Sequence, residues 1–170
     1  TSLSNKERIF RAINYIEQTI QKGFSVVVVV SAMGKETDRL LSLYDDLDEY
    51  KDTDDLASLL SAGEQISSSL FSIMLNKRKI KGKSFQGWQL PIETELDAYN
   101  SLIKDINIKK IKKSLLAKEV PVISGFQGVN KNLRVSTLGR GGSDTTAVAL
   151  AAKLKAFRCD IYTDVEGVFT

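Results

Sequence analysis

Apolar residues follow two different spacings along this chain, and the spacing changes at glycines. Near the start they recur at the spacing of one helix face, at Ile9, Phe10, Ile13, Ile16 and Ile20. Ser4-Asn5-Lys6-Glu7 before this run has the form of a capping box, and Gly23 after it predicts the end of the helix. The next run, Val26 to Val30, is unbroken and β-branched, which is typical of a strand buried on both faces. A helix, a glycine and a buried strand in this order predict an α/β protein with a parallel sheet.

Later runs add further elements to the same α/β pattern. Val120 to Ser124 predicts a second buried strand, followed by a loop at Gly125 to Gly128. Asn130 to Asn132 predicts a hairpin turn, and Asp160 to Thr163 predicts a third strand. Isoleucines alternate with lysines between Ile103 and Leu116, which predicts a helix with a basic, solvated face.

The acidic residues fall into one dense run and one isolated position. Residues 45–55 hold seven acids in eleven positions. A solvated, mobile linker explains this run better than a metal site, because nothing in the pattern fixes a ligand geometry. The apolar pattern of Leu56 to Ile73 is then interrupted by Ser61-Ala62-Gly63-Glu64. An unpaired buried carboxylate is costly, so the local pattern favours an exposed Glu64.

The densest chemical signal is the stretch from Thr137 to Ala147, where three glycines precede a run of good helix formers. Glycines allow tight turns and a close approach of backbone amides to a ligand. A helix start favours an anion, and Arg140 adds a planar cation that can hold a carboxylate or a phosphate. This is not a Walker A loop, because no Lys-Ser or Lys-Thr follows the glycines. The alternative is a capped turn with Asp144 as the N-cap.

Composition narrows the possible chemistry mainly by exclusion. The 170 residues contain no histidine, which excludes Ser-His-Asp hydrolysis and histidine-ligated zinc within this segment. The single cysteine, Cys159, excludes a disulfide framework and favours a cytoplasmic location. The net charge of +3 is too small to indicate nucleic-acid binding. The longest unbroken apolar run is far shorter than the roughly 18 residues of a membrane span, so no membrane segment is expected.

Three predicted strand ends carry polar loops, at Ser31 to Thr37, Ser124 to Gly128, and Thr163 to Asp164. Open α/β sheets bind ligands outside the carboxyl ends of their strands. We therefore expect these loops to line one edge of the sheet beside the glycine-rich stretch. An ordinary strand-to-helix loop, with Thr37 or Asp38 as a cap, remains an alternative for the first of them.

Taken together, these motifs resemble the amino-acid kinase domain of bacterial aspartate kinases (aspartokinases) along essentially the whole chain. The matching pieces, in chain order, are Thr1-Ser2, Val30 to Gly34 with Thr37-Asp38, Ser61 to Ser67, Gly125 to Val129, Thr137 to Ala147, and Thr163 to Thr170. The resemblance implies a three-layer α/β/α sandwich around a mainly parallel sheet. It also implies phosphorylation of the side-chain carboxylate of L-aspartate by ATP, with Mg²⁺ brought by ATP and no metal site in the chain.

The resemblance also implies roles for particular residues. Thr37, Glu64, Arg140 and Ser143 match aspartate-binding positions, with Glu64 facing the substrate ammonium and Arg140 holding a substrate carboxylate. Arg140 and Asp144 are the implied catalytic residues. The implied ATP-binding residues are Ser31, Gly142, Thr163, Asp164 and Phe169, the last standing where the family usually has tyrosine.

This sequence departs from the family pattern at its first and last residues. Lys-Phe-Gly-Gly, which precedes Thr-Ser in the family, is not in this sequence, nor are the later nucleotide-binding residues and the regulatory ACT domains. Residues 1–170 are therefore expected to be a partial amino-acid kinase domain, with little or no kinase activity alone. The resemblance implies a homo-oligomer for the full-length protein. Another member of the amino-acid kinase superfamily, or a non-catalytic module that uses this fold, is the alternative reading.

Overall fold

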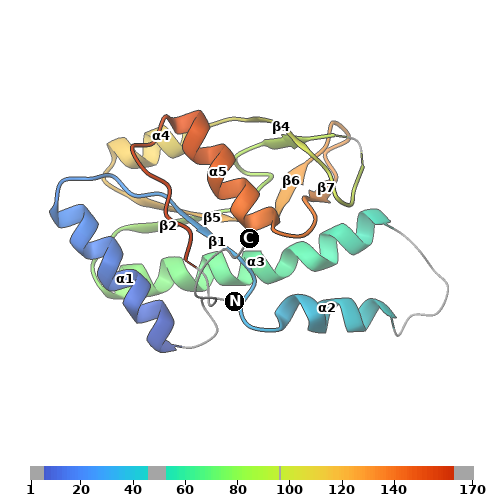
Figure 1. Ribbon diagram of the computed structural model, residues 1–170, viewed down its shortest axis with the longest axis horizontal. Helices are drawn as coiled ribbons and strands as arrows, with labels where there is room; N and C mark the ends of the chain where they lie inside the picture. Colours follow the sequence, from blue (N-terminus) through green and yellow to red (C-terminus); the bar gives the residue numbers. More distant parts are fainter. Residues whose placement is uncertain (1–5, 46–52, 96, 163–170) are drawn as a thin grey trace, which may run out of the picture.

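The computed structural model describes residues 6–45, 53–95 and 97–162, and it consists of helices packed on short strands (Figure 1). The helices are α1 (Lys6–Gln21), α2 (Glu36–Asp45), α3 (Thr53–Lys77), α4 (Lys109–Leu116) and α5 (Gly142–Leu154). The strands are β1 (Val28–Val30), β2 (Gly82–Phe85), β3 (Ile92–Thr94), β4 (Ile103–Ile106), β5 (Val120–Ser124), β6 (Gln127–Val129) and β7 (Val135–Thr137). The predicted helix at the start is confirmed from Lys6 onward, and Ser4 of its proposed cap lies outside the described residues.

The first sheet is parallel, with the strand order β1-β5-β2. Its central strand β5 is buried at all five positions, as the apolar run from Val120 predicts. The predicted strand at Val26 to Val30 is shorter than expected, because β1 includes only Val28–Val30. Residues 26–29 are half-buried rather than fully buried. Among the described strands, β1 pairs only with β5, so it lies at an edge where part of its surface stays open.

The second sheet is small and mixed, in the order β4-β3-β6-β7. Strands β6 and β7 form an antiparallel hairpin with Val129 opposite Val135, which confirms the turn predicted at Asn130 to Asn132. The loop expected at Gly125 to Gly128 is only partly a loop, because Gln127 already belongs to β6. The hairpin matters for the site because β7 leads directly into the glycine-rich stretch.

Two apolar clusters lie on opposite faces of the parallel sheet and make the molecule a three-layer sandwich. Val122 of β5 packs with residues of α1 and α3, including Ile13 and Phe71. The next residue, Ile123, faces the other way and packs with Ile111 of α4 and Leu150 of α5. Figure 1 shows the same arrangement, with α1 and α3 on one side of the strands and α4 and α5 on the other. The expected α/β/α architecture is confirmed.

Two sequence predictions of element type are wrong. The stretch from Ile103 to Leu116 is not one helix but strand β4 followed by helix α4. Ile103 and Ile106 are apolar at helical spacing, but the pairing of β4 with β3 overrides this local pattern. The strand expected at Asp160 to Thr163 is also not found, because residues 160–162 lie outside any strand and Thr163 is outside the described residues.

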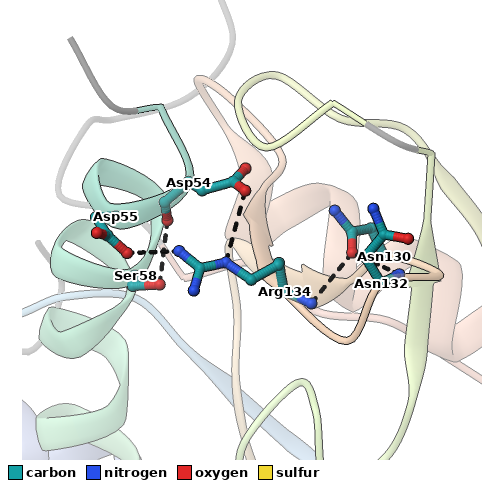
Figure 2. A network of polar contacts seen from close by, with 6 residues as sticks. All are labelled: Asp54, Asp55, Ser58, Asn130, Asn132 and Arg134. Carbon is teal, nitrogen blue, oxygen red and sulfur yellow. Dashed lines mark hydrogen bonds and ion pairs between the residues drawn. The ribbon is translucent and has the colours of Figure 1, made fainter.

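The acidic run between residues 45 and 55 begins and ends in helices, so the prediction of a linker is wrong at both of its ends. Asp45 ends α2, residues 46–52 lie outside the described residues, and Asp54 and Asp55 lie in the first turn of α3. Both contact Arg134 at the start of β7, with Asp54 Oδ2 at 3.5 Å from Nε and Asp55 Oδ1 at 2.5 Å from Nη2 (Figure 2). Acids in a first helical turn also interact favourably with the helix dipole. These two acids therefore join α3 to the β6–β7 hairpin.

Candidate functional site

The carboxyl ends of β1 and β5 lie side by side and form the floor of the candidate site. Val30 is in register with Ser124, and the Gly125 amide donates to the Val30 carbonyl at 2.9 Å. The two following loops, which begin at Ser31 and Gly125, therefore leave the sheet at the same edge. This confirms that two of the three polar strand ends meet, while Thr163 and Asp164 lie outside the described residues.

Glu64 of α3 is buried at this edge, with only 3% of its surface exposed. The local prediction of an exposed Glu64 is wrong, because α3 runs unbroken through the small residues and packs against the strands along its length. The Ala32 amide, in the loop after β1, donates to Glu64 Oε1 at 2.9 Å. The other carboxyl oxygen, Oε2, is one of only two buried side-chain polar atoms without a hydrogen bond among the described residues.

Burial raises the pKa of the Glu64 carboxyl to about 7, and the hydrogen bond from the Ala32 amide opposes this rise. Desolvation is the larger cause, since a carboxylate removed from water loses its hydration. A carboxyl group with one free buried oxygen therefore needs either a proton or a cationic partner. At neutral pH this group is poised to accept a positively charged ligand.

A buried hydroxyl network fixes the backbone beneath Glu64. Ser124 Oγ lies 2.8 Å from Ser68 Oγ, 3.2 Å from the carbonyl oxygen of Glu64 and 2.5 Å from Gln86 Oε1. Because one hydroxyl carries one proton, Ser124 donates to one of these groups at a time, while Ser68 can donate to Ser124. Sequence reasoning placed Ser124 at the sheet edge but missed Ser68 and Gln86, which carry no local motif.

The glycine-rich stretch turns from β7 into α5 through two glycines in the left-handed region, Gly139 at φ 77° and Gly141 at φ 74°. Such backbone angles favour glycine because a Cβ would collide with the chain. Gly141, not Asp144, is the N-cap of α5, and it has no side-chain cap. The helix therefore starts at Gly142, three residues earlier than a cap at Asp144 would place it, and Asp144 lies in its first turn.

The start of α5 approaches the floor of the site very closely at Gly125. A Cβ built on Gly125 would lie 2.7 Å from Ser143 Oγ and 2.9 Å from Ser143 Cα. The neighbouring Gly142 is buried, and a Cβ there would lie 2.8 Å from Phe126 Cδ2. Ser124 thus contacts the backbone of Glu64, and the next residue, Gly125, lies against Ser143. The structure brings these two predicted substrate-binding residues together.

The remaining predicted site residues differ in how deeply the structure buries them. Ser31 follows β1 directly and is half-buried, and Thr37 is the second residue of α2, also half-buried. The start of α2 is brought to Glu64 through Gly63, where a Cβ would lie 3.6 Å from Glu36 Cγ. Arg140 and Asp144 are exposed. Phe169, like Thr163 and Asp164, lies outside the described residues.

The arrangement offers complementary charges to a small ligand. Glu64 can receive a cation, while Arg140 and the amide groups at the start of α5 can receive an anion. Within the described ranges, no three His, Cys, Asp or Glu side chains are grouped so that they could hold a metal ion. Among the helices of the described residues, none has the length and apolar character needed to cross a membrane.

The fold and the site together define an α/β protein with charged candidate site residues at the carboxyl edge of its parallel sheet, where proteins of this class bind ligands. The profile of the amino acid kinase family matches residues 1–170, and the chain belongs to this family.

Curated relatives include aspartokinases of several bacteria. The aspartokinase of Geobacillus stearothermophilus is 47% identical over 170 residues, which are 100% of this chain and 42% of the relative. Aspartokinase 2 of Bacillus subtilis (strain 168) is 46% identical with the same coverage. This chain therefore spans about two fifths of the length of the curated relatives it matches.

Solved structures of aspartate kinases are also similar to this chain. The aspartate kinase from Synechocystis is 40% identical, with a TM-score of 0.80 over 97% of this chain and 27% of that one. E. coli aspartokinase III in complex with aspartate and ADP has a TM-score of 0.84 over 98% of this chain and 48% of that one. Its sequence identity is 23%, so it supports the fold alone.

Proposed function

We propose that this chain is the aspartate-binding part, with the start of the ATP-binding part, of an aspartate kinase catalytic domain. The complete protein would transfer the γ-phosphoryl group of ATP to the side-chain carboxylate of L-aspartate, giving 4-phospho-L-aspartate for lysine, threonine and methionine synthesis. The observation that carries this proposal is the buried Glu64 carboxyl with an unpartnered Oε2 at the sheet edge. The bacterial aspartokinases at 46–47% identity support the same reaction.

In this proposal Glu64 binds the α-ammonium group of aspartate. Its Oε1 is already held by the Ala32 amide, so the carboxyl group is oriented before the ligand arrives. An ammonium group at Oε2 would supply the missing partner and would favour the charged form of the carboxyl. Arg140 would hold a carboxylate of the substrate with its planar guanidinium, and Thr37 would complete the site with its hydroxyl.

ATP would lie beside the start of α5 in this proposal. The first turn of α5 has no side-chain cap, so its backbone amides could bind phosphate oxygens. The Gly142 amide already donates to the Gly139 carbonyl, so Gly142 would act mainly by its lack of a side chain, which leaves room for the phosphates. Ser31 would contact the phosphates from the end of β1, while Thr163, Asp164 and Phe169 stay predictions that rest on the resemblance. Mg²⁺ would arrive with ATP and would offset charge on the phosphoryl group.

The chemistry asked of the chain is positioning rather than proton abstraction. The side-chain carboxylate of aspartate is ionised at neutral pH and is itself the nucleophile, so no histidine or other general base is needed. Ser143 lies where Gly125 brings α5 onto the end of β5, which would place its hydroxyl and the nearby Asp144 between substrate and phosphate. Holding both reactants in line would supply most of the acceleration. A cytoplasmic homo-oligomer is the assembly we propose for the complete protein.

Isothermal calorimetry of L-aspartate binding tests this proposal. Binding is measured rather than turnover, because the chain spans about two fifths of its relatives. We expect L-aspartate to bind the wild-type chain, and we expect Glu64→Gln and Arg140→Ala each to abolish detectable binding. Glu93→Gln and Arg8→Ala, at exposed positions on β3 and α1, serve as matched controls. A folded wild-type chain that does not bind L-aspartate, or that binds it equally well after Glu64→Gln, would overturn the proposal.

A further inference from the structure

A loop that the proposed function does not use lies directly against the glycine-rich stretch. The Ser101 amide donates to the Thr137 carbonyl at 2.8 Å, and the Thr137 amide donates to the Ala98 carbonyl at 2.8 Å. Ala98 and Ser101 are buried, with 6% and 3% of their surfaces exposed. This loop, residues 97–102, is therefore attached along the end of β7, at the point where the chain turns toward Arg140.

The side chain of Asn100 occupies the space beside Gly139. A Cβ built on Gly139 would lie 2.3 Å from Asn100 Oδ1 and 3.2 Å from Asn100 Cγ. Asn100 itself adopts φ 55°, a left-handed conformation that asparagine tolerates better than most residues. Two unusual backbone conformations thus face each other, and the carboxamide fills the gap that the missing side chain of Gly139 leaves open.

This contact falls one residue before Arg140, whose own side chain is exposed. The backbone around Arg140 is tied at two points, where the Leu138 amide donates to Phe126 O at 2.8 Å and the Gly142 amide donates to Gly139 O at 3.0 Å. The second tie is made to Gly139, the residue that Asn100 contacts. The position of Gly139 therefore affects the backbone direction at Arg140 and the start of α5 together.

We propose that Asn100 is a positioning residue, which holds Gly139 in place and so directs Arg140 toward the carboxylate of the substrate. This inference rests on the proposed function for the identity of the ligand. The geometric part, in which Asn100 orders the glycine-rich turn, stands without a ligand. The two parts therefore need separate measurements.

The geometric part is tested by amide hydrogen exchange in the Asn100→Gly variant. Glycine accepts the positive φ of position 100, so this change removes the side-chain contact and leaves the loop backbone unstrained. We expect the Leu138 and Gly142 amides to exchange roughly fivefold faster than in the wild type, a change typical of losing one side-chain contact. The amides of Asn132 and Arg134, which bond Asn130 Oδ1 in the opposite turn, should be unchanged. Equal exchange at Leu138 and Gly142 in both proteins would overturn the inference.

The functional part is tested by L-aspartate binding to the same variant and to two others. We expect Asn100→Gly to weaken binding roughly tenfold, since a displaced binding group loses much of its effect. Asn100→Asp, which keeps the shape and tolerates the same φ, should leave the exchange rate of the Gly142 amide and the L-aspartate affinity as in the wild type. Asn107→Gly, which removes a side-chain bond to the Lys109 amide of α4, controls for general destabilisation and should bind as the wild type does.

The outcomes separate the two proposals. Normal L-aspartate binding by Asn100→Gly would overturn the positioning role while leaving the proposed function intact. A folded wild-type chain that fails to bind L-aspartate would overturn the proposed function, and the exchange rates would still decide whether Asn100 orders the turn.

Discussion

At the scale of single residues, Glu64 shows how burial changes the pKa of a common side chain. Its carboxyl group is almost completely removed from water, yet only one oxygen has a hydrogen-bond partner. The cost of an ionised group in this setting raises its pKa to about 7. Glu64 should therefore destabilise the unliganded fold near neutral pH and stabilise it when a cation binds.

The pH dependence of stability should report this group. The pKa of Glu64 is higher in the folded chain, about 7, than its ordinary value of 4.5, so the folded state holds this proton more tightly. The resulting stabilisation is complete below pH 4.5 and is lost as the pH rises through about 7. We expect a loss of up to about 3 kcal/mol in the free energy of unfolding, which urea denaturation at pH 5 and pH 8 can measure.

Glu64→Gln should remove most of this pH dependence, because an amide does not ionise. Glu93→Gln, at an exposed position on β3, should keep it. Identical changes in stability between pH 5 and pH 8 for the wild type and Glu64→Gln would show that Glu64 does not titrate in this range.

At the scale of elements, the site depends on how closely α5 approaches the end of β5. The contact is made by Gly125 against Ser143, with no room for a side chain between them. Gly63 plays a similar part between α3 and the loop after β1, where a Cβ would lie 2.9 Å from Ala32 Cβ. Small residues at these two crossings let the three elements converge around Ser124.

Gly125→Ala should push α5 away from β5. The new methyl group would collide with the backbone and side chain of Ser143, so we expect a loss of about 1–3 kcal/mol in the free energy of unfolding, as for other overpacked sites. L-aspartate binding should weaken as well. Gly23→Ala is the control, because Gly23 has φ 87° and no atom within 4 Å of a built Cβ.

The two glycine variants are best compared by chemical denaturation and calorimetry together. Gly23→Ala should lower stability through backbone strain, by roughly 1–2 kcal/mol, and leave binding intact. If Gly125→Ala binds L-aspartate as well as Gly23→Ala does, the close approach of α5 is not needed for the site.

At the scale of the whole molecule, β5 joins the two apolar clusters. Val122 belongs to the cluster with α1 and α3, and Ile123 belongs to the cluster with α4 and α5. Both side chains are fully buried. Because adjacent residues of one strand serve both faces, neither face can lose its packing without disturbing the other.

The described layers should therefore unfold in one transition. We expect urea unfolding curves from far-ultraviolet circular dichroism and from fluorescence of Trp88, the one tryptophan of the sequence, to coincide. Ile123→Ala should lower the midpoint for both probes by the same amount, corresponding to about 2–5 kcal/mol. Separate midpoints for the two signals would show that the layers unfold independently.

Much of the fold could be predicted because its signals are local. The β-branched and apolar run at Val120 to Ser124, the turn at Asn130 to Asn132 and the helix after the glycines are all confirmed. The errors arose where pairing between distant segments overrode local spacing, as at β4, whose isoleucines had suggested a helix. Two element ends also differ from the prediction: β1 is short at the edge of its sheet, and α5 begins early because Gly141 adopts a left-handed conformation at its N-cap.

The sequence by itself determined the α/β class, the glycine-rich turn and the kind of chemistry available, since these depend on residue type and spacing. Only the tertiary structure decided that Glu64 is buried with one oxygen unpartnered, that Ser143 meets Gly125, and that Asn100 fills the space beside Gly139. Each of these contacts joins residues at least 18 positions apart, and burial is a property of the packed chain. No local pattern carries that information.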